Sequence, residues 1–187
     1  YQGCDPSFMH PVAAEKKREI RAKYQLPDHY ILNVGSIEER KNALSAVQAL
    51  TILPEQIHLV IVGRHTEYTD KIERFIKENK LEERVHIISN VPFDDLPAFY
   101  QLAEIFVYPS RFEGFGIPII EALYSGIPVV AATGSCLEEA GGPDSIYVHP
   151  DDIKGMANAF KQIYSDTERK KEMIEKGQKF AKRFSEE

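Results

Sequence analysis

The stretch Ser110–Glu121, which reads S-R-F-E-G-F-G-I-P-I-I-E, decides the fold and follows the apolar run Ile105–Tyr108. An apolar run that ends at Pro109 is typical of a short buried strand. The two glycines predict a turn, and Pro118 stands where proline is favoured, in the first turn of a helix. The stretch therefore predicts a strand, a glycine turn and a helix in direct succession.

The start of this helix is a candidate binding site for a phosphate group. A helix N-terminus leaves backbone N–H groups unpaired and carries partial positive charge. Gly114 and Gly116 lack a Cβ and let an anion approach the main chain closely. A lone G-x-G also precedes helices in many α/β proteins that bind nothing there, so the glycines alone leave both explanations open.

Two carboxylates bracket the glycine turn. Glu113 lies in the turn, and Glu121 lies about one helical turn into the helix. Fixed carboxylates accept hydrogen bonds from hydroxyl groups, so the pair predicts a ligand with sugar rings on either side of a phosphate. The alternative is that the helix dipole alone favours a glutamate near an exposed helix start.

Six apolar runs alternate with helical segments, near residues 30, 57, 85, 105, 128 and 146. This rhythm predicts an α/β fold: a Rossmann-like, doubly wound parallel sheet of about six strands with helices on both faces. Ligands of such sheets bind beyond the carboxyl ends of the strands. A dinucleotide G-x-G-x-x-G follows the first strand, whereas Gly114 and Gly116 follow a late one, which argues against NAD.

The bulk composition fits one domain of a cytoplasmic protein. The 187 residues are 43% hydrophobic, which is enough for a core, and the net charge of −6 argues against a nucleic-acid partner. No stretch approaches the length of a transmembrane segment. Cys4 and Cys136 have no metal-type spacing and are expected to be free thiols.

The stretch from Glu113 to Ala131, E-G-F-G-I-P-I-I-E-A-L-Y-S-G-I-P-V-V-A, resembles the E-x7-E signature of retaining glycosyltransferases of the two-domain GT-B type, family 4. The resemblance implies the C-terminal, donor-binding domain of such an enzyme. The donor would be a nucleoside diphosphate sugar, UDP- or GDP-linked, that carries a mannose- or glucose-type hexose. The acceptor would be a glycan or a lipid-linked sugar, as in polysaccharide biosynthesis.

The resemblance also implies roles for individual residues. Glu121 would bind the ribose hydroxyls, and Glu113 would act at the reacting sugar by binding its hydroxyls. The groups of the turn would lie near the sugar and the diphosphate: Gly114, Phe115, Gly116 and Ile117. Hydrogen-bond donors aimed at the leaving diphosphate lower the barrier, so no protein nucleophile is required.

The segment after the first predicted strand, G-S-I-E-E-R-K-N from Gly35 to Asn42, resembles the family phrase V-G-x-x-E-x-R-K-N. Lys41 takes by position the role of the lysine that contacts the nucleotide diphosphate, and Gly35 and Ser36 would lie against the donor. Many relatives carry an arginine directly after the glycine, where this chain has Ser36. One cation of the usual pair is therefore missing, and Arg40 as its replacement is a hypothesis.

Three further positions complete the predicted donor site. Asn90 and Val91 follow the third predicted strand, where relatives contact the nucleotide base through the main chain. Ser135 lies in a small polar loop, which in relatives is close to the phosphates or the sugar. Asp94 and Asp95 allow a metal hypothesis, but capping of the next helix explains both, so neither a metal nor another cofactor is expected.

Residues 1–10 are predicted to be an interdomain linker, and residues 11–187 the donor-binding domain. Asp5 and Phe8 match the family phrase N-G-x-D-x-x-x-F, at which the chain enters its second domain. We expect the acceptor-binding N-terminal domain to lie outside this chain, at the cytoplasmic face of a membrane if it makes peripheral contact there. The chain alone is then expected to bind donor weakly and to transfer nothing.

Two alternatives from other classes remain open. A nucleotide-sugar epimerase has the same architecture, and assaying the full-length protein for both reactions would separate it from a transferase. A non-catalytic nucleotide-binding module would carry a vestigial pocket, which calorimetry with UDP and GDP would test.

Overall fold

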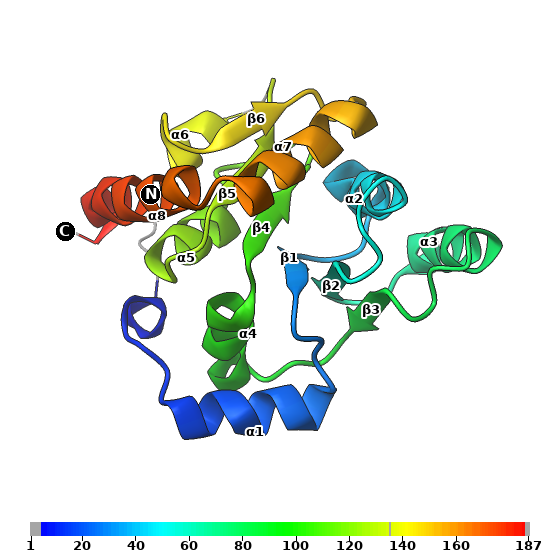
Figure 1. Cartoon of the computed structure of the whole chain (residues 1–187), viewed down its shortest axis with the longest axis horizontal. Coiled ribbons are helices and arrows are strands. Elements are labelled where there is room, and N and C mark those ends of the chain that lie inside the picture. The colour runs from blue at the N-terminus through cyan, green and yellow to red at the C-terminus, as the bar shows by residue number, and fades with distance from the viewer. Residues whose placement is uncertain (1–4, 135, 186–187) are drawn as a thin grey trace.

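The apolar runs form one parallel sheet of six strands in the order β3-β2-β1-β4-β5-β6 (Figure 1). The computed structural model describes residues 5–134 and 136–185. Every neighbouring pair of strands is parallel, which confirms the predicted doubly wound α/β class. The strands are Tyr30–Val34 (β1), His58–Val62 (β2), Val85–Ile88 (β3), Ile105–Tyr108 (β4), Val129–Ala132 (β5) and Ile146–Val148 (β6).

Helices connect the strands, and no helix within the described residues is long and apolar enough to cross a lipid bilayer. The α-helices are Ala14–Tyr24 (α1), Ala43–Leu50 (α2), Glu67–Glu78 (α3), Leu96–Leu102 (α4), Ile117–Tyr124 (α5), Leu137–Gly141 (α6), Ile153–Ser165 (α7) and Thr167–Ala181 (α8). Short 3-10 helices are Pro6–Met9 (η1), Glu39–Lys41 (η2), Phe93–Asp95 (η3) and Lys182–Phe184 (η4).

The core consists of two apolar layers, one on each face of the sheet. Side chains alternate along a strand, so Leu32 and Phe106 face one layer while Ile31 and Ile105 face the other. Helices α1, α4, α5 and α6 cover the first layer, and α2, α3 and α7 cover the second (Figure 1). A sheet covered on both faces needs apolar residues at nearly every strand position, which is why the runs are continuous.

The entering segment packs on the domain through one aromatic side chain. Asp5 caps η1 by accepting a hydrogen bond from Ser7 N at 2.8 Å, and Phe8 in this turn has no exposed surface. The end of the predicted linker 1–10 is therefore part of the domain core.

The predicted capping role of Asp95 is wrong. Asp95 precedes α4 but makes no side-chain cap hydrogen bond. Its buried carboxylate instead accepts hydrogen bonds from α1, at 2.6 Å from Tyr24 Oη, 3.0 Å from Lys23 Nζ and 3.2 Å from Lys16 Nζ. These partners lower the pKa of Asp95 to about 2, the Tyr24 hydrogen bond most strongly. A buried carboxylate with several charged donors is more stable there than one turned towards the helix start.

The strand order reverses between β1 and β4. The chain builds outward from β1 through β2 to β3, and then returns to place β4 on the other side of β1. The loops that follow β1 and β4 therefore leave the same edge of the sheet in opposite directions. Open α/β sheets bind ligands at this position.

Candidate functional site

The loops after β1 and β4 are hydrogen-bonded to each other. Arg111 N donates to Arg40 O at 2.8 Å, and the Arg40 guanidinium donates to Phe112 O at 3.0 Å. Ser110 Oγ lies 3.4 Å from the same Arg40 carbonyl oxygen. These bonds bring together two stretches that are about 70 positions apart in the chain.

Asn42 ties a third loop to this pair. Its backbone is left-handed, with φ of 61°, and its side chain is buried. Asn42 Nδ2 donates to Pro109 O at 3.1 Å and to Pro150 O at 3.0 Å. Asparagine tolerates this backbone conformation better than most residues and supplies two amide hydrogens. A single side chain thus holds the loops after β1, β4 and β6.

Lys41 and Glu113 form an ion pair at the centre of these loops. Lys41 Nζ lies 2.7 Å from Glu113 Oε2, and the two side chains are only 17% and 9% exposed. Ser110 Oγ donates to the same carboxylate at 2.8 Å. The Arg40 guanidinium is 3.6 Å from it and more exposed. Two predicted cations and one predicted acid therefore meet at one place.

Glu121 lies one helical turn into α5, as predicted, and its carboxyl group is partly buried. Tyr100 on α4 donates its hydroxyl hydrogen to Glu121 Oε1 at 2.6 Å. Burial raises the pKa of Glu121 to about 7, while the Tyr100 hydrogen bond lowers it and the charge of Asp5 raises it. The group can therefore gain or lose its proton near neutral pH.

Tyr108 at the end of β4 contacts the ammonium group of Lys41. Lys41 Nζ donates to Tyr108 Oη at 3.2 Å and lies 5.7 Å from the centre of its ring. Burial raises the pKa of the Tyr108 hydroxyl, and the charges of Glu113 and Glu121 both raise it further. Tyr108 thus belongs to the same group of contacting side chains as Lys41 and Glu113.

The turn before α5 requires glycine at position 116 but has space for a side chain at position 114. Gly116 has φ of 89°, and a Cβ there would lie 3.0 Å from Leu137 Cδ2 of α6. A Cβ on Gly114 would meet nothing within 4 Å. The thiol of Cys136 donates to the carbonyl oxygens of Glu113 and Gly114, at 3.1 and 2.9 Å. Helix α6 thus packs against the turn that precedes Ile117.

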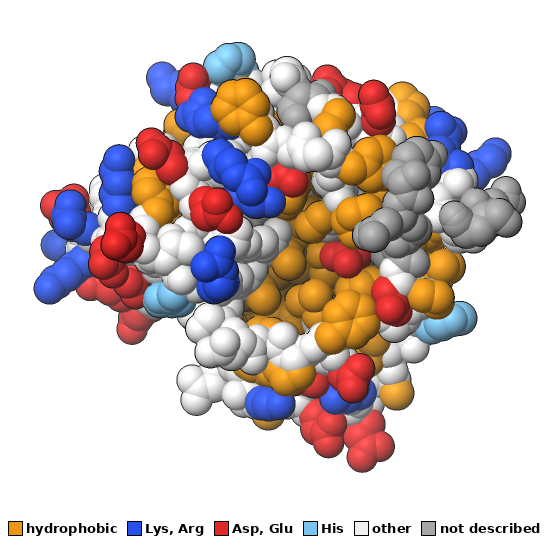
Figure 2. Space-filling model, turned by 180° about the vertical axis from the view of Figure 1, so that it is seen from behind, with side chains coloured by type: hydrophobic (Ala, Val, Ile, Leu, Met, Phe, Trp, Pro, Cys, Tyr) orange, Lys and Arg blue, Asp and Glu red, His pale blue; other side chains and the backbone are white. Residues whose placement is uncertain are grey.

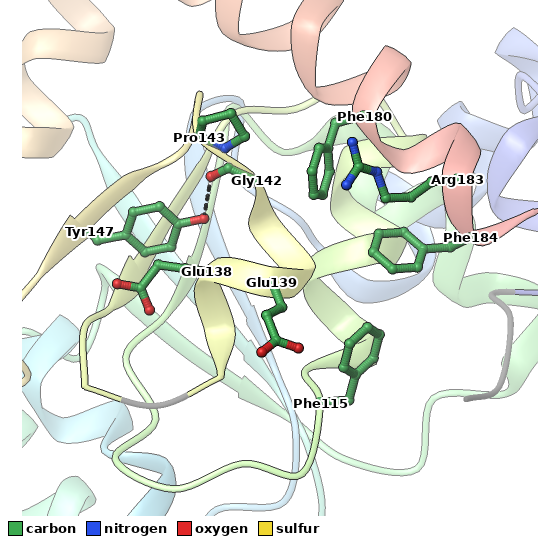
Figure 3. A pocket seen from close by; sticks show the side chains of 9 residues that line it. All are labelled: Phe115, Glu138, Glu139, Gly142, Pro143, Tyr147, Phe180, Arg183 and Phe184. Carbon is green, nitrogen blue, oxygen red and sulfur yellow. Dashed lines mark hydrogen bonds between the residues drawn. The ribbon is translucent and has the colours of Figure 1, made fainter.

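The side chain of Phe115 turns away from the Lys41–Glu113 pair towards the end of the chain. Its ring meets Phe184 edge-on, with centroids 5.5 Å apart. The two rings line a pocket of about 610 Å³, whose walls come from α6, α8 and η4 (Figure 3). Tyr147 closes one side of this pocket by donating its hydroxyl hydrogen to Gly142 O. This leaves the main chain of Phe115, and not its ring, available for the role predicted at the turn.

The backbone after β1 passes close to the backbone after β2. A Cβ on Gly63 would lie 1.8 Å from Gly35 O, so only glycine fits there. Ser36 Oγ donates to the Glu38 carboxylate, which lowers the pKa of Glu38. Glu38 Oε1 is in turn 3.6 Å from the Arg40 guanidinium, so Ser36 and Arg40 share an acidic neighbour.

The remaining predicted residues lie on other loops. Asn90 and Val91 follow β3, and β2 separates this strand from β1. Asn90 is exposed with a left-handed φ of 60°, and Val91 packs against the core. Ser135 lies outside the described residues.

The described residues hold no group of three or more His, Cys, Asp or Glu side chains placed to bind a metal ion. Figure 2 presents the face opposite to that of Figure 1, where hydrophobic side chains line a hollow and charged side chains gather around it. An apolar hollow with a few polar groups is the usual form of a small-molecule site.

Several site residues were not predicted. Ser110 directly follows β4 and stands three positions before Glu113, a spacing at which a hydroxyl can reach the carboxylate. Asn42 stands at a predicted helix start, where asparagine suggests a special backbone conformation. Tyr108 is the last residue of β4 and therefore lies at the ligand edge of the sheet. Tyr100 gave no local signal, because its partner Glu121 is 21 positions away.

Comparison with known proteins identifies the family. A model of the glycosyl transferases group 1 family matches residues 16–180. O-antigen chain mannosyltransferase B of Escherichia coli is 33% identical over 171 residues, which cover 89% of this chain and 45% of that protein. The chain thus spans less than half the length of this relative.

Solved structures have the same fold. The C-terminal domain of a glycosyl transferase group 1 family protein (LpcC) from Francisella tularensis aligns with a TM-score of 0.84 at 21% identity, covering 98% of this chain and 99% of that one. The Anabaena protein Alr3699/HepE, solved in complex with UDP and glucose, aligns with a TM-score of 0.89 at 21% identity, covering 98% and 51%. The chain therefore belongs to the glycosyl transferases group 1 family, and its fold is that of a C-terminal domain of a GT-B glycosyltransferase.

Proposed function

We propose that this chain is the donor-binding domain of a retaining glycosyltransferase. The enzyme transfers a mannose- or glucose-type hexose from a UDP- or GDP-linked sugar to a glycan or lipid-linked acceptor. One observation carries the proposal: Lys41 lies 2.7 Å from Glu113 at the strand-order reversal, and Glu121 lies one helical turn into the α5 helix that follows. Two acids and a cation in this arrangement suit sugar hydroxyls on either side of a diphosphate.

Lys41 is the proposed partner of the diphosphate. Without donor its ammonium group pairs with Glu113, so neither charge is left unpaired where both side chains are largely buried. A diphosphate offers Lys41 a partner of higher charge. When Lys41 turns to the diphosphate, the Glu113 carboxylate becomes free to accept hydrogen bonds from the sugar. Binding of the diphosphate thus prepares Glu113 to bind the sugar.

Charge stabilisation drives the proposed reaction. The glycosidic bond breaks towards an oxocarbenium-like state while negative charge builds on the leaving diphosphate. The N–H groups of the turn, at Phe115, Gly116 and Ile117, stabilise that charge, together with Lys41 once it has turned to the bound donor. The acceptor oxygen forms a bond to the anomeric carbon as the bond to the diphosphate breaks. Its hydroxyl proton passes to the departing phosphate oxygen, so neither a metal nor a protein nucleophile takes part.

Arg40 is proposed to supply the second cation. Its guanidinium lies 3.6 Å from Glu113, beside the ammonium of Lys41. Ser36 occupies the position of the missing arginine and is linked to Arg40 through Glu38. This proximity supports Arg40 as the replacement for the arginine that many relatives carry at the position of Ser36. Gly35 and Ser36 themselves are proposed to approach the donor through the main chain.

The nucleoside end of the donor is assigned to the other side of Tyr108. Glu121 accepts hydrogen bonds from the ribose hydroxyls, and the main chain of Asn90 and Val91 contacts the base. The Escherichia coli relative is named as a mannosyltransferase, and the Anabaena structure contains UDP and glucose, which supports a nucleoside diphosphate hexose as donor. The acceptor binds to an N-terminal domain that the entering segment joins to this domain.

Calorimetry with UDP and GDP tests the proposal on the chain as it stands. We expect one of the two nucleotides to bind, and Glu121→Gln to weaken that binding about tenfold, because it removes the charge from the hydrogen-bond acceptor. The matched control is Glu172→Gln on the exposed surface of α8, which should bind as the wild type does. Absence of binding by the wild type, or equal affinity in Glu121→Gln, would refute the assignment.

A further inference from the structure

Two aromatic side chains link the entering segment to the proposed ribose-binding acid. Phe8 in η1 has no exposed surface, and its ring lies edge-on to Tyr100 with centroids 5.3 Å apart. Tyr100 on α4 is equally buried and donates its hydroxyl hydrogen to Glu121 Oε1 at 2.6 Å. Contact therefore runs from Phe8 through Tyr100 to the Glu121 carboxylate.

The Tyr100 ring is held by β4 as well. Phe106 stacks on it, with centroids 5.3 Å apart and the ring planes inclined by 29°. A buried ring that is stacked by one neighbour and met edge-on by another has little freedom to turn. Its hydroxyl group therefore points to one place, which suits a group that must hold a ligand-binding carboxylate at fixed geometry.

We propose that Tyr100 is a positioning residue for Glu121, and that Phe8 holds Tyr100 in place, so that residues 5–9 form part of the donor site. The inference rests on the proposed function, because it takes Glu121 as the acceptor of the ribose hydroxyls. Phe8 and Tyr100 act through Glu121 and need no contact with the donor.

Tyr100 on α4 donates a hydrogen bond to the Glu121 carboxyl group, the charge of Asp5 acts on the pKa of Glu121, and the charge of Glu121 acts on the pKa of Tyr108. The Tyr100 hydrogen bond lowers the pKa of Glu121, whereas burial and the charge of Asp5 raise it. Tyr100 therefore favours the ionised carboxylate, whose Oε2 and remaining lone pair on Oε1 can accept hydroxyl hydrogens. The position and the charge of the acid depend on the same hydroxyl group.

The variant Tyr100→Phe removes this hydroxyl and keeps the ring. Loss of this hydrogen bond raises the pKa of Glu121, so a smaller fraction of the group is ionised at pH 7. If binding requires the carboxylate, nucleotide affinity falls severalfold at pH 7 and changes much less at pH 9. A general loss of packing would lower the affinity equally at both pH values.

The matched control is Tyr30→Phe. Tyr30 is also fully buried, but it donates its hydroxyl hydrogen to Phe99 O, at 2.6 Å. Calorimetry from pH 6 to pH 9 gives the UDP and GDP dissociation constants, and carbon-13 NMR of the carboxyl group gives the pKa of Glu121. We expect a higher pKa and a higher pH midpoint for binding in Tyr100→Phe only. Equal curves for the two variants would overturn the inference.

A second pair of variants tests the contact with Phe8. Phe8→Leu keeps an apolar side chain and removes the edge-on ring contact, and Phe160→Leu makes the same change in the other core layer. We expect Phe8→Leu to weaken nucleotide binding about threefold at pH 7. Phe160→Leu should bind as the wild type does. Equal affinities in the two folded variants would overturn the part assigned to Phe8.

Glu121→Gln separates this inference from the proposed function. If this variant binds UDP and GDP as the wild type does, Glu121 has no role at the ribose, and both proposals fall. If it loses affinity while Tyr100→Phe matches Tyr30→Phe, only the positioning role of Tyr100 falls.

Discussion

The half-buried carboxyl group of Glu121 should destabilise the fold at neutral pH. Burial raises its pKa from the ordinary 4.5 to about 7, although Tyr100 donates a hydrogen bond to it. The folded state therefore binds more protons than the unfolded state between pH 4.5 and pH 7. The contribution of this group to the free energy of unfolding is fully present below pH 4.5 and is lost as the pH rises through 7.

The variant Glu121→Gln should not lose stability as the pH rises, because the glutamine amide stays neutral where the buried acid would ionise. A pKa difference of this size corresponds to about 3 kcal/mol. Glu121→Gln should thus unfold with nearly the same free energy as the wild type at pH 4, and with about 3 kcal/mol more at pH 8. Other groups titrate alike in both proteins, so their contributions cancel in the difference.

Urea unfolding at pH 4, 6 and 8 measures this difference directly. Glu172→Gln is the control, since its exposed carboxylate pairs with Lys176 in the same helix, and its difference from the wild type should stay small. A Glu121→Gln difference that stays constant with pH, or that shrinks as the pH rises, would refute the reasoning. The expected result would mean that the acid is kept for binding at a cost in stability.

Three further predictions concern other contacts. Asp95→Asn should lower the free energy of unfolding by about 2 kcal/mol at pH 7 and by almost nothing at pH 2. The reason is that folding lowers the pKa of Asp95 from 3.8 to about 2, so the stability that its charge contributes is lost as the pH falls through that range. Gly116→Ala should lower stability by about 1–3 kcal/mol in thermal unfolding, whereas Gly114→Ala, with open space around it, should not. Lys41→Met should weaken UDP or GDP binding and destabilise the fold by leaving Glu113 unpaired, and the double variant with Glu113→Gln should recover stability but not affinity.

The sheet could be predicted from the sequence because a doubly covered parallel sheet needs continuous apolar strands. That Lys41 and Glu113 share one edge of the sheet could also be predicted. Each residue comes shortly after a predicted strand, and the carboxyl ends of parallel strands share one edge. Their 2.7 Å contact was not predicted and is made possible because β1 and β4 are neighbours.

The parts that could not be predicted depend on contacts between distant segments. An acid before a helix suits a cap and an ion pair equally. Asp95 forms ion pairs because Lys16 and Lys23, 79 and 72 positions earlier, lie across from it. Tyr100 has the pattern of an ordinary core residue, and only the packing of α4 against α5 gives its hydroxyl a carboxylate partner. Local sequence holds no information about such partners.

The amide of Asn42 has a consequence for engineering. Because it donates to the carbonyl oxygens of Pro109 and Pro150, the three loops at this edge of the sheet form one mechanical unit. A chimaera that exchanges only the Ser110–Glu121 loop for that of a relative would keep Pro109 but change the loop backbone that is hydrogen-bonded to Arg40, at Arg111 and Phe112. Grafts intended to change the donor sugar should therefore transplant all three segments together and keep the asparagine that joins them.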